Sequence, residues 1–95
     1  MTTLEMIHLR MAGQDQETLA LAIWKAVATA DDAPDVRVYH HARVEGDLLI
    51  HLHREGSEQD TEPSVLGLRL ASLLRNHGMV GHSVWVRREE GNSAV

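Results

Sequence analysis

Residues 36–54 read VRVYHHARVEGDLLIHLHR, and this stretch decides the fold. On both sides of Gly46, apolar side chains alternate with polar or aromatic ones, which is typical of half-buried strands. We therefore predict strands over Val36–Val44 and Leu48–Arg54. Because only a short polar segment separates them, the two strands are expected to form an antiparallel hairpin with one apolar face in the core.

The loop of this hairpin is predicted from the need to keep both apolar sets on one side of the sheet. A two-residue Glu45-Gly46 turn would pair Ile50 with His41 and divide the apolar residues between the two faces. A three-residue loop, Val44–Gly46, with Gly46 at positive φ in a bulge, keeps Ile50 with its apolar neighbours. We predict this bulged loop.

Two further stretches alternate with the same period, and we predict strands over Leu4–Ala12 and His82–Glu89. In the first strand Ile7 and Leu9 are expected to face the core, and in the last strand Val84 takes that side. The remaining side chains of both strands would face away from the core.

Two amphipathic helices lie between these strands in the sequence. The first has Asp15 as its expected N-cap and runs to about Ala30, with a stripe of leucine, isoleucine, valine and alanine. The second is predicted to carry Pro63 in its first turn, His77 in its last turn and Gly78 just after its end. Its apolar stripe contains Leu66, Leu70, Leu73 and Leu74.

The resulting element order is β-α-β-β-α-β. Right-handed crossovers around a central hairpin predict an α+β two-layer sandwich with sheet order 4-1-3-2 and both helices on one face. Over residues 4–89 this layout resembles the ferredoxin-like superfold, which hosts many unrelated functions. We expect one domain over residues 1–90 and a flexible tail over residues 91–95.

Composition excludes several classes of function. The 95-residue chain has no cysteine, so it has no disulfide, thiolate metal site or thiol nucleophile. Its formal net charge of −5 disfavours nonspecific binding to nucleic acid. No apolar run approaches the ~20 residues that span a bilayer, and no signal-peptide pattern opens the chain, so we expect a cytoplasmic protein without membrane contact.

The candidate site is the side of the sheet that the helices leave uncovered. In the predicted register Tyr39 lies opposite His51, and His8 would lie about 5 Å from His51 if their strands are aligned. All fourteen carboxylates are expected in loops, helices, strand ends or the tail, which would make this side locally basic. The ten candidate binding residues are His8, Arg10, Arg37, Tyr39, His41, Arg43, His51, His53, Trp85 and Arg87.

This residue set favours association with another protein, because Trp, Tyr, Met and Arg are enriched in interface cores. The layout is similar to that of the dimeric α+β barrel family, which includes antibiotic-biosynthesis-type monooxygenases. That resemblance implies a homodimer formed by two sheet faces, although two basic faces would repel each other. We predict a small association module that forms a homodimer or binds a protein partner.

Three alternatives use the same side chains. His8, His51 and His53 are a possible zinc site, although solvated surface histidines explain the same spacing. The arginines are suited to a small anionic ligand, and the layout is similar to RNA-recognition domains without their sequence motifs. A less favoured alternative is an enzyme with His8 or His51 as acid or base, although no P-loop, nucleophile elbow, HExxH or dinucleotide motif occurs.

Overall fold

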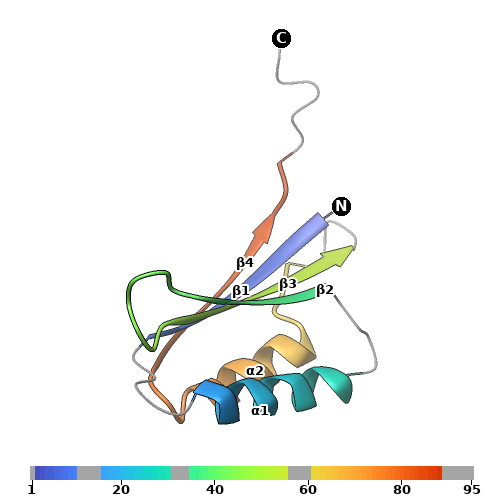
Figure 1. The fold of residues 1–95 in the computed structure, drawn as a ribbon. Helices are drawn as coiled ribbons and strands as arrows, with labels where there is room; N and C mark the ends of the chain where they lie inside the picture. Colours follow the sequence, from blue (N-terminus) through green and yellow to red (C-terminus); the bar gives the residue numbers. More distant parts are fainter. Residues whose placement is uncertain (1, 11–15, 31–34, 56–60, 89–95) are drawn as a thin grey trace.

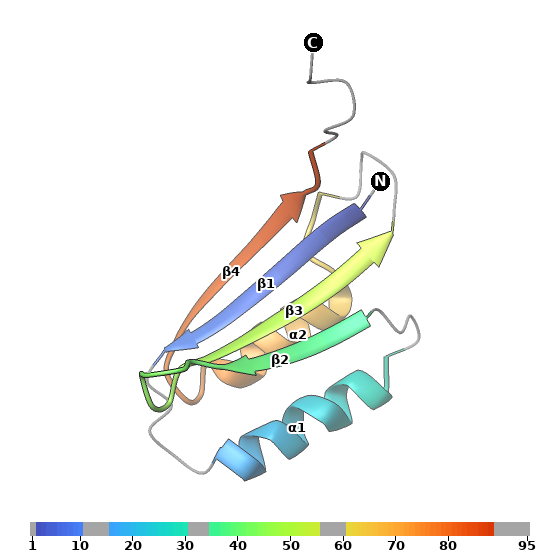
Figure 2. The same ribbon diagram turned by 45° about the horizontal axis from the view of Figure 1, so that its top comes forward.

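Four antiparallel strands form one sheet in the order β2-β3-β1-β4. The fold is known from a computed structural model that describes residues 2–10, 16–30, 35–55 and 61–88. Figures 1 and 2 show both helices on the same side of the sheet, which confirms the predicted ferredoxin-like α+β sandwich. The elements are β1 (Thr2–Arg10), α1 (Gln16–Ala28), β2 (Asp35–His40), β3 (Leu48–Glu55), α2 (Val65–Leu74) and β4 (Met79–Val86).

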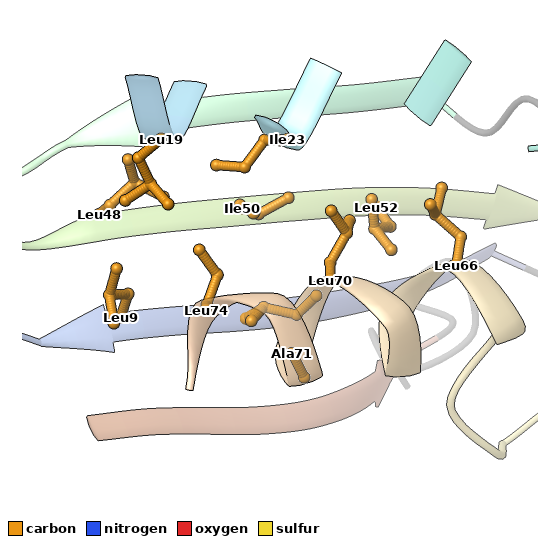
Figure 3. Packing of buried hydrophobic residues seen from close by; sticks show 11 residues of the cluster. Leu9, Leu19, Ile23, Leu48, Ile50, Leu52, Leu66, Leu70, Ala71 and Leu74 are labelled. Atoms are coloured by element: carbon orange, nitrogen blue, oxygen red, sulfur yellow. The ribbon is translucent and has the colours of Figure 1, made fainter. Parts of the chain in front are cut away.

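The hydrophobic core lies between the sheet and the two helices (Figure 3). Burial alternates residue by residue along β1 and β3, as the period of two predicted. Each large apolar side chain buried in this way stabilises the fold by about 1.5–3 kcal/mol, so this cluster is the main driving force for folding. Its members are Ile7, Leu9, Leu19, Ile23, Leu48, Ile50, Leu52, Leu66, Leu70, Ala71 and Leu74.

Helix α2 begins at Val65, after Pro63 rather than with Pro63 in its first turn. Ser64 is its N-cap, and the Ser64 hydroxyl accepts a hydrogen bond of 2.9 Å from the backbone N–H of Gly67. Pro63 therefore precedes the cap, and its predicted place in the first turn is wrong. A capping hydroxyl satisfies a backbone donor that the helix leaves unpaired, which fixes the start of the helix.

The end of α2 also differs from the prediction. The helix ends at Leu74, and the N–H groups of Asn76 and His77 bond to carbonyls three residues earlier, in consecutive 3₁₀-type turns. These turns satisfy the last carbonyls without a left-handed residue, so the predicted role of Gly78 as the helix stop is wrong, and His77 lies beyond the helix. In the described part of the chain no helix is long and apolar enough to cross a membrane.

The hairpin loop is longer than the predicted three residues. Strand β2 ends at His40, and residues 41–47 form the connection to β3. Gly46 has the predicted positive φ, at 95°. The observed register places Ile50 opposite Val38 and therefore differs from the predicted pairing by two residues. A shift of two residues leaves every side chain on its predicted face, which is why the alternation of residues could not detect it.

Strand β4 begins at Met79 rather than at His82 and ends at Val86 rather than at Glu89. His82 therefore lies in the middle of the strand, on the side that faces the helices, opposite Ile7 of β1. The predicted N-cap Asp15 and the predicted tail, residues 91–95, lie outside the described residues.

Candidate functional site: the open face of the sheet

We call the side of the sheet that faces away from the helices the open face. Its middle rows run across all four strands. One row reads Ser83, Met6, His51 and Arg37, and the next reads Gly81, His8, Leu49 and Tyr39. A third row contains Trp85, Leu4, His53 and Asp35. The central strands β1 and β3 thus contribute apolar and imidazole side chains, and the charged groups lie towards the edges.

The structure places eight of the ten predicted site residues on the open face or at its ends. The exceptions are His41 and Arg43, whose predicted places on a strand are wrong, because both lie in the loop after β2. The ring nitrogen Nδ1 of His41 accepts hydrogen bonds from the backbone N–H groups of Arg43 and Val44, at 2.9 and 2.8 Å. These two bonds turn the backbone away from β3 and end the strand at His40, whose side chain is exposed.

The predicted alignment of His8 with His51 is wrong. Met6 lies opposite His51, and Leu49 lies opposite His8, so the two histidines are offset by one pleat. Within the described residues, no group of three His, Cys, Asp or Glu side chains is placed to hold a metal ion. The structure therefore does not bring His8, His51 and His53 together as the predicted zinc ligands.

Three rings form a chain across β2 and β3. The Tyr39 and His51 rings have centroids 5.0 Å apart, and the His51 and His53 rings meet edge to face at 5.9 Å. Tyr39 lies opposite Leu49 rather than opposite His51 as predicted, but it reaches His51 diagonally. Burial, with smaller contributions from the charges of His53 and Arg37, lowers the pKa of His51 below its ordinary value of 6.5. This partly buried imidazole is therefore held in its neutral form near pH 7.

Acidic residues accompany the arginines, contrary to the predicted basic surface. Asp35 lies on the open face, and its carboxylate accepts a hydrogen bond of 3.1 Å from Arg37, which raises the pKa of that guanidinium. Glu55 takes the same side at the end of β3, opposite Thr2. The carboxylate of Asp47 lies 3.5 Å from Nε2 of His8. The positive charge predicted for this side is thus largely compensated.

A hollow of about 620 Å³ lies at the end of the open face next to the β2–β3 loop. In Figures 1 and 2 this loop lies beside the carboxyl end of β1. The side chains of Met6 and Leu49 form apolar parts of its wall, and Tyr39 contributes an aromatic ring. His8 and Asp47 contribute polar groups. The complete lining is Met6, His8, Tyr39, His40, His41, Asp47, Leu48, Leu49, Gly81, His82 and Ser83.

The opposite face of the sheet holds a polar group that the sequence analysis missed. Glu5 lies inside β1 on the helix side and is fully buried, so the expectation that all carboxylates lie outside strand interiors is wrong. Its carboxylate accepts hydrogen bonds from the hydroxyl and N–H of Ser64, at 2.7 and 3.2 Å, and lies 2.5 Å from Nε2 of His82. Arg54 Nε lies 3.7 Å away. These four residues, Glu5, Arg54, Ser64 and His82, are called the buried polar cluster.

The buried polar cluster contains a serine, a histidine and a carboxylate, but their order is wrong for nucleophilic catalysis. The Ser64 hydroxyl donates to Glu5 and not to the imidazole of His82, so the serine–histidine pairing that activates a serine nucleophile is absent from this cluster. The same hydroxyl caps α2, and Glu5 is not accessible to solvent. The cluster therefore connects the N-terminus of α2 to strands β1, β3 and β4 through polar contacts with Glu5.

The buried polar cluster could have been predicted in part from the sequence. Glu5, Arg54 and His82 all occupy core-facing positions of their strands, and they carry complementary charges. Charged residues are almost never fully buried unless they are paired, so three of them on one face predict mutual contact. The position of Ser64 could not be found in this way, because it depends on where α2 packs.

Comparison of this chain with protein-family models, curated proteins and solved structures found no match. The function is therefore inferred from the geometry of the site.

Proposed function

We propose that residues 1–90 are a single cytoplasmic domain that associates with a second copy of itself through the open face. The observation that supports this most directly is the apolar middle of that face. Leu4, Met6 and Leu49 on the two central strands are only half-buried, and Trp85 beside them is 58% exposed. Contiguous exposed apolar surface of this kind marks interaction sites, and Trp, Tyr and Met are the residues enriched in interface cores.

The charges of the open face are compatible with an identical partner. Among the described residues it carries Arg10, Arg37 and Arg87 at its ends and edges, and Asp35, Asp47 and Glu55 balance them. Arg37 is already paired with Asp35 at 3.1 Å. With neutral histidines the formal charge of this set is zero, so the repulsion expected between two basic faces does not arise.

A second copy is a better partner for this surface than residues 89–95. The sequence after Arg88 is EEGNSAV, which offers two acidic residues and only two small apolar ones. A two-fold dimer instead brings the same apolar rows of both copies against each other, so that each copy covers the other.

The test is the molar mass in solution, measured by size-exclusion chromatography with light scattering over a range of protein concentrations. We expect a dimer, and we expect Trp85→Lys to weaken it by about 30-fold or more, since a tryptophan buried in an interface is a frequent hot spot and the loss of a hot-spot side chain costs about 2 kcal/mol or more. Trp24→Lys is the matched control, because Trp24 is 46% exposed on α1, on the other side of the molecule.

Urea unfolding of both variants verifies that neither substitution unfolds the domain. A wild-type protein that stays monomeric at millimolar concentration contradicts the proposal, and so does equal weakening by the two lysine substitutions. A blue shift of the Trp85 fluorescence with concentration, measured in a Trp24→Phe background, is the expected spectroscopic sign of its burial.

A further inference from the structure

We propose that the hollow beside the β2–β3 loop binds a small uncharged aromatic molecule that carries one hydroxyl or N–H group. The inference goes beyond self-association. Because Met6 and Leu49 line the hollow and also belong to the surface proposed for the second copy, ligand binding and self-association compete with each other. Three features support it: the opening left by a glycine, a loop anchored by a histidine, and the chemistry of the walls.

Gly81 creates the space on the β4 side of the hollow. It lies opposite His8 on the open face, where a larger residue would project over the sheet. A Cβ atom built at this position meets no other heavy atom within 4 Å, and the backbone there is not in the left-handed region. Neither backbone conformation nor crowding therefore requires glycine here, and its effect is to keep the hollow open.

The loop of residues 41–47 forms the opposite wall and has a defined shape. His41 accepts the N–H groups of Arg43 and Val44, and its own N–H donates to the carbonyl of Asp47 at 3.2 Å. These bonds, together with the positive φ of Gly46, hold the loop in one conformation. Asp47 is thereby kept next to His8, with its side chain only 12% exposed. A preformed wall lowers the entropic cost of ligand binding.

The lining selects the chemical class of the ligand. No arginine or lysine occurs among the described residues that line the hollow, and the carboxylate of Asp47 disfavours an anion. That carboxylate is only 12% exposed and lies 3.5 Å from Nε2 of His8, so it already has a polar partner within the protein. Tyr39 and Met6 offer a ring and a thioether, both of which prefer an aromatic partner. His8 and Asp47 already have partners within the protein, and each has a further lone pair or N–H with which it can hydrogen-bond one polar substituent of a ligand.

Phenol, benzoate and cyclohexanol are a matched set of probes for this proposal, because they vary charge and aromaticity around a six-membered ring. Binding is followed by NMR at pH 8, above the ordinary titration range of histidine. We expect phenol to shift the amides of Met6, His8 and Gly81 in a saturable way, with millimolar affinity. Benzoate is expected to bind about tenfold more weakly and cyclohexanol about threefold more weakly.

Two substitutions of Gly81 test whether phenol binds in the hollow. Gly81→Leu projects a side chain into the space and is expected to weaken phenol binding by about tenfold or more. Gly81→Ala is the control for loss of glycine itself and is expected to retain most of the binding. The chemical shifts of residues outside the hollow verify that both variants are folded.

The proposal is overturned if phenol produces no saturable shift, if benzoate binds as tightly as phenol, or if Gly81→Leu binds phenol like the wild type. Phenol binding is measured at a protein concentration at which light scattering finds the monomer, so that a second copy does not cover the hollow. Failure of ligand binding is then distinguishable from failure of self-association, which is measured as molar mass.

Discussion

The two faces of the sheet use similar side chains in opposite ways. On the helix side, Glu5 and His82 are bonded to each other, and Glu5 has further contacts with Ser64 and Arg54. On the open side, His51 and His53 contact each other and Tyr39 through their rings. Nε2 of His51 is buried and has no hydrogen-bond partner among the described residues. On the helix side Thr3 Oγ1 and Arg54 Nε are likewise buried without such a partner, but the buried carboxylate of Glu5 is hydrogen-bonded, because an uncompensated buried charge is costly.

The difference predicts where a substitution costs stability and where it costs binding. Removing a member of the buried polar cluster leaves its partners uncompensated between the sheet and α2. Removing a side chain of the open face leaves the core intact. The following three predictions test this contrast, beginning with the largest expected effect.

Glu5→Ala is expected to lower the free energy of unfolding by about 3–5 kcal/mol. The substitution removes the buried carboxylate and leaves His82 and Ser64 without their hydrogen-bond acceptor. Glu5→Gln keeps the volume and is expected to cost less. Urea unfolding followed by circular dichroism measures both. Glu45→Ala, at an exposed loop position, is the control and should change stability by less than about 0.5 kcal/mol. Equal stability of Glu5→Ala and the control would refute the structural role of the cluster.

Gly67→Ala tests how closely α2 approaches the cluster. A Cβ at Gly67 would lie 1.7 Å from Oε2 of Glu5, so we expect this substitution to destabilise the protein by about 1–3 kcal/mol. In a Glu5→Ala background the obstruction is absent, and the same substitution should become neutral or stabilise by about 0.5–1 kcal/mol, since alanine is favoured over glycine in a helix. A double-mutant cycle measures this change of sign, and additive effects would contradict the close approach.

His51 on the open face gives the smallest expected effect on stability. Its lowered pKa means that the unfolded chain binds the proton at a higher pH than the folded protein does. Stability is therefore full above about pH 6.5 and falls as the pH drops below that value. We expect His51→Gln to reduce this loss between pH 8 and pH 5, as measured by urea unfolding at both values. An NMR titration of the His51 ring with a midpoint at or above 6.5 would contradict the prediction.

Much of the fold could be predicted because alternation along a strand assigns each side chain to a face. Ile7, Ile50 and Leu52 are buried, and Tyr39 and Trp85 are exposed, as expected. The candidate site was predicted less completely. Its residues were assigned to the correct face, but their neighbours across the strands were not, because a shift of two residues preserves the pattern. The loop residues His41 and Arg43 were misplaced because the alternation continues to Val44, whereas the hydrogen bonds to His41 Nδ1 end the strand at His40.

The sequence by itself determined the order of the elements, the two sides of each strand and the positive φ of Gly46, because these follow from side-chain periodicity and from the conformations that a single residue can adopt. Only the tertiary structure decided that Ser64 bonds to Glu5, that Met6 lies opposite His51, and that a hollow opens beside Gly81. Each of these depends on contacts between segments far apart in the chain, and their energies are set by packing and pairing that local pattern does not encode.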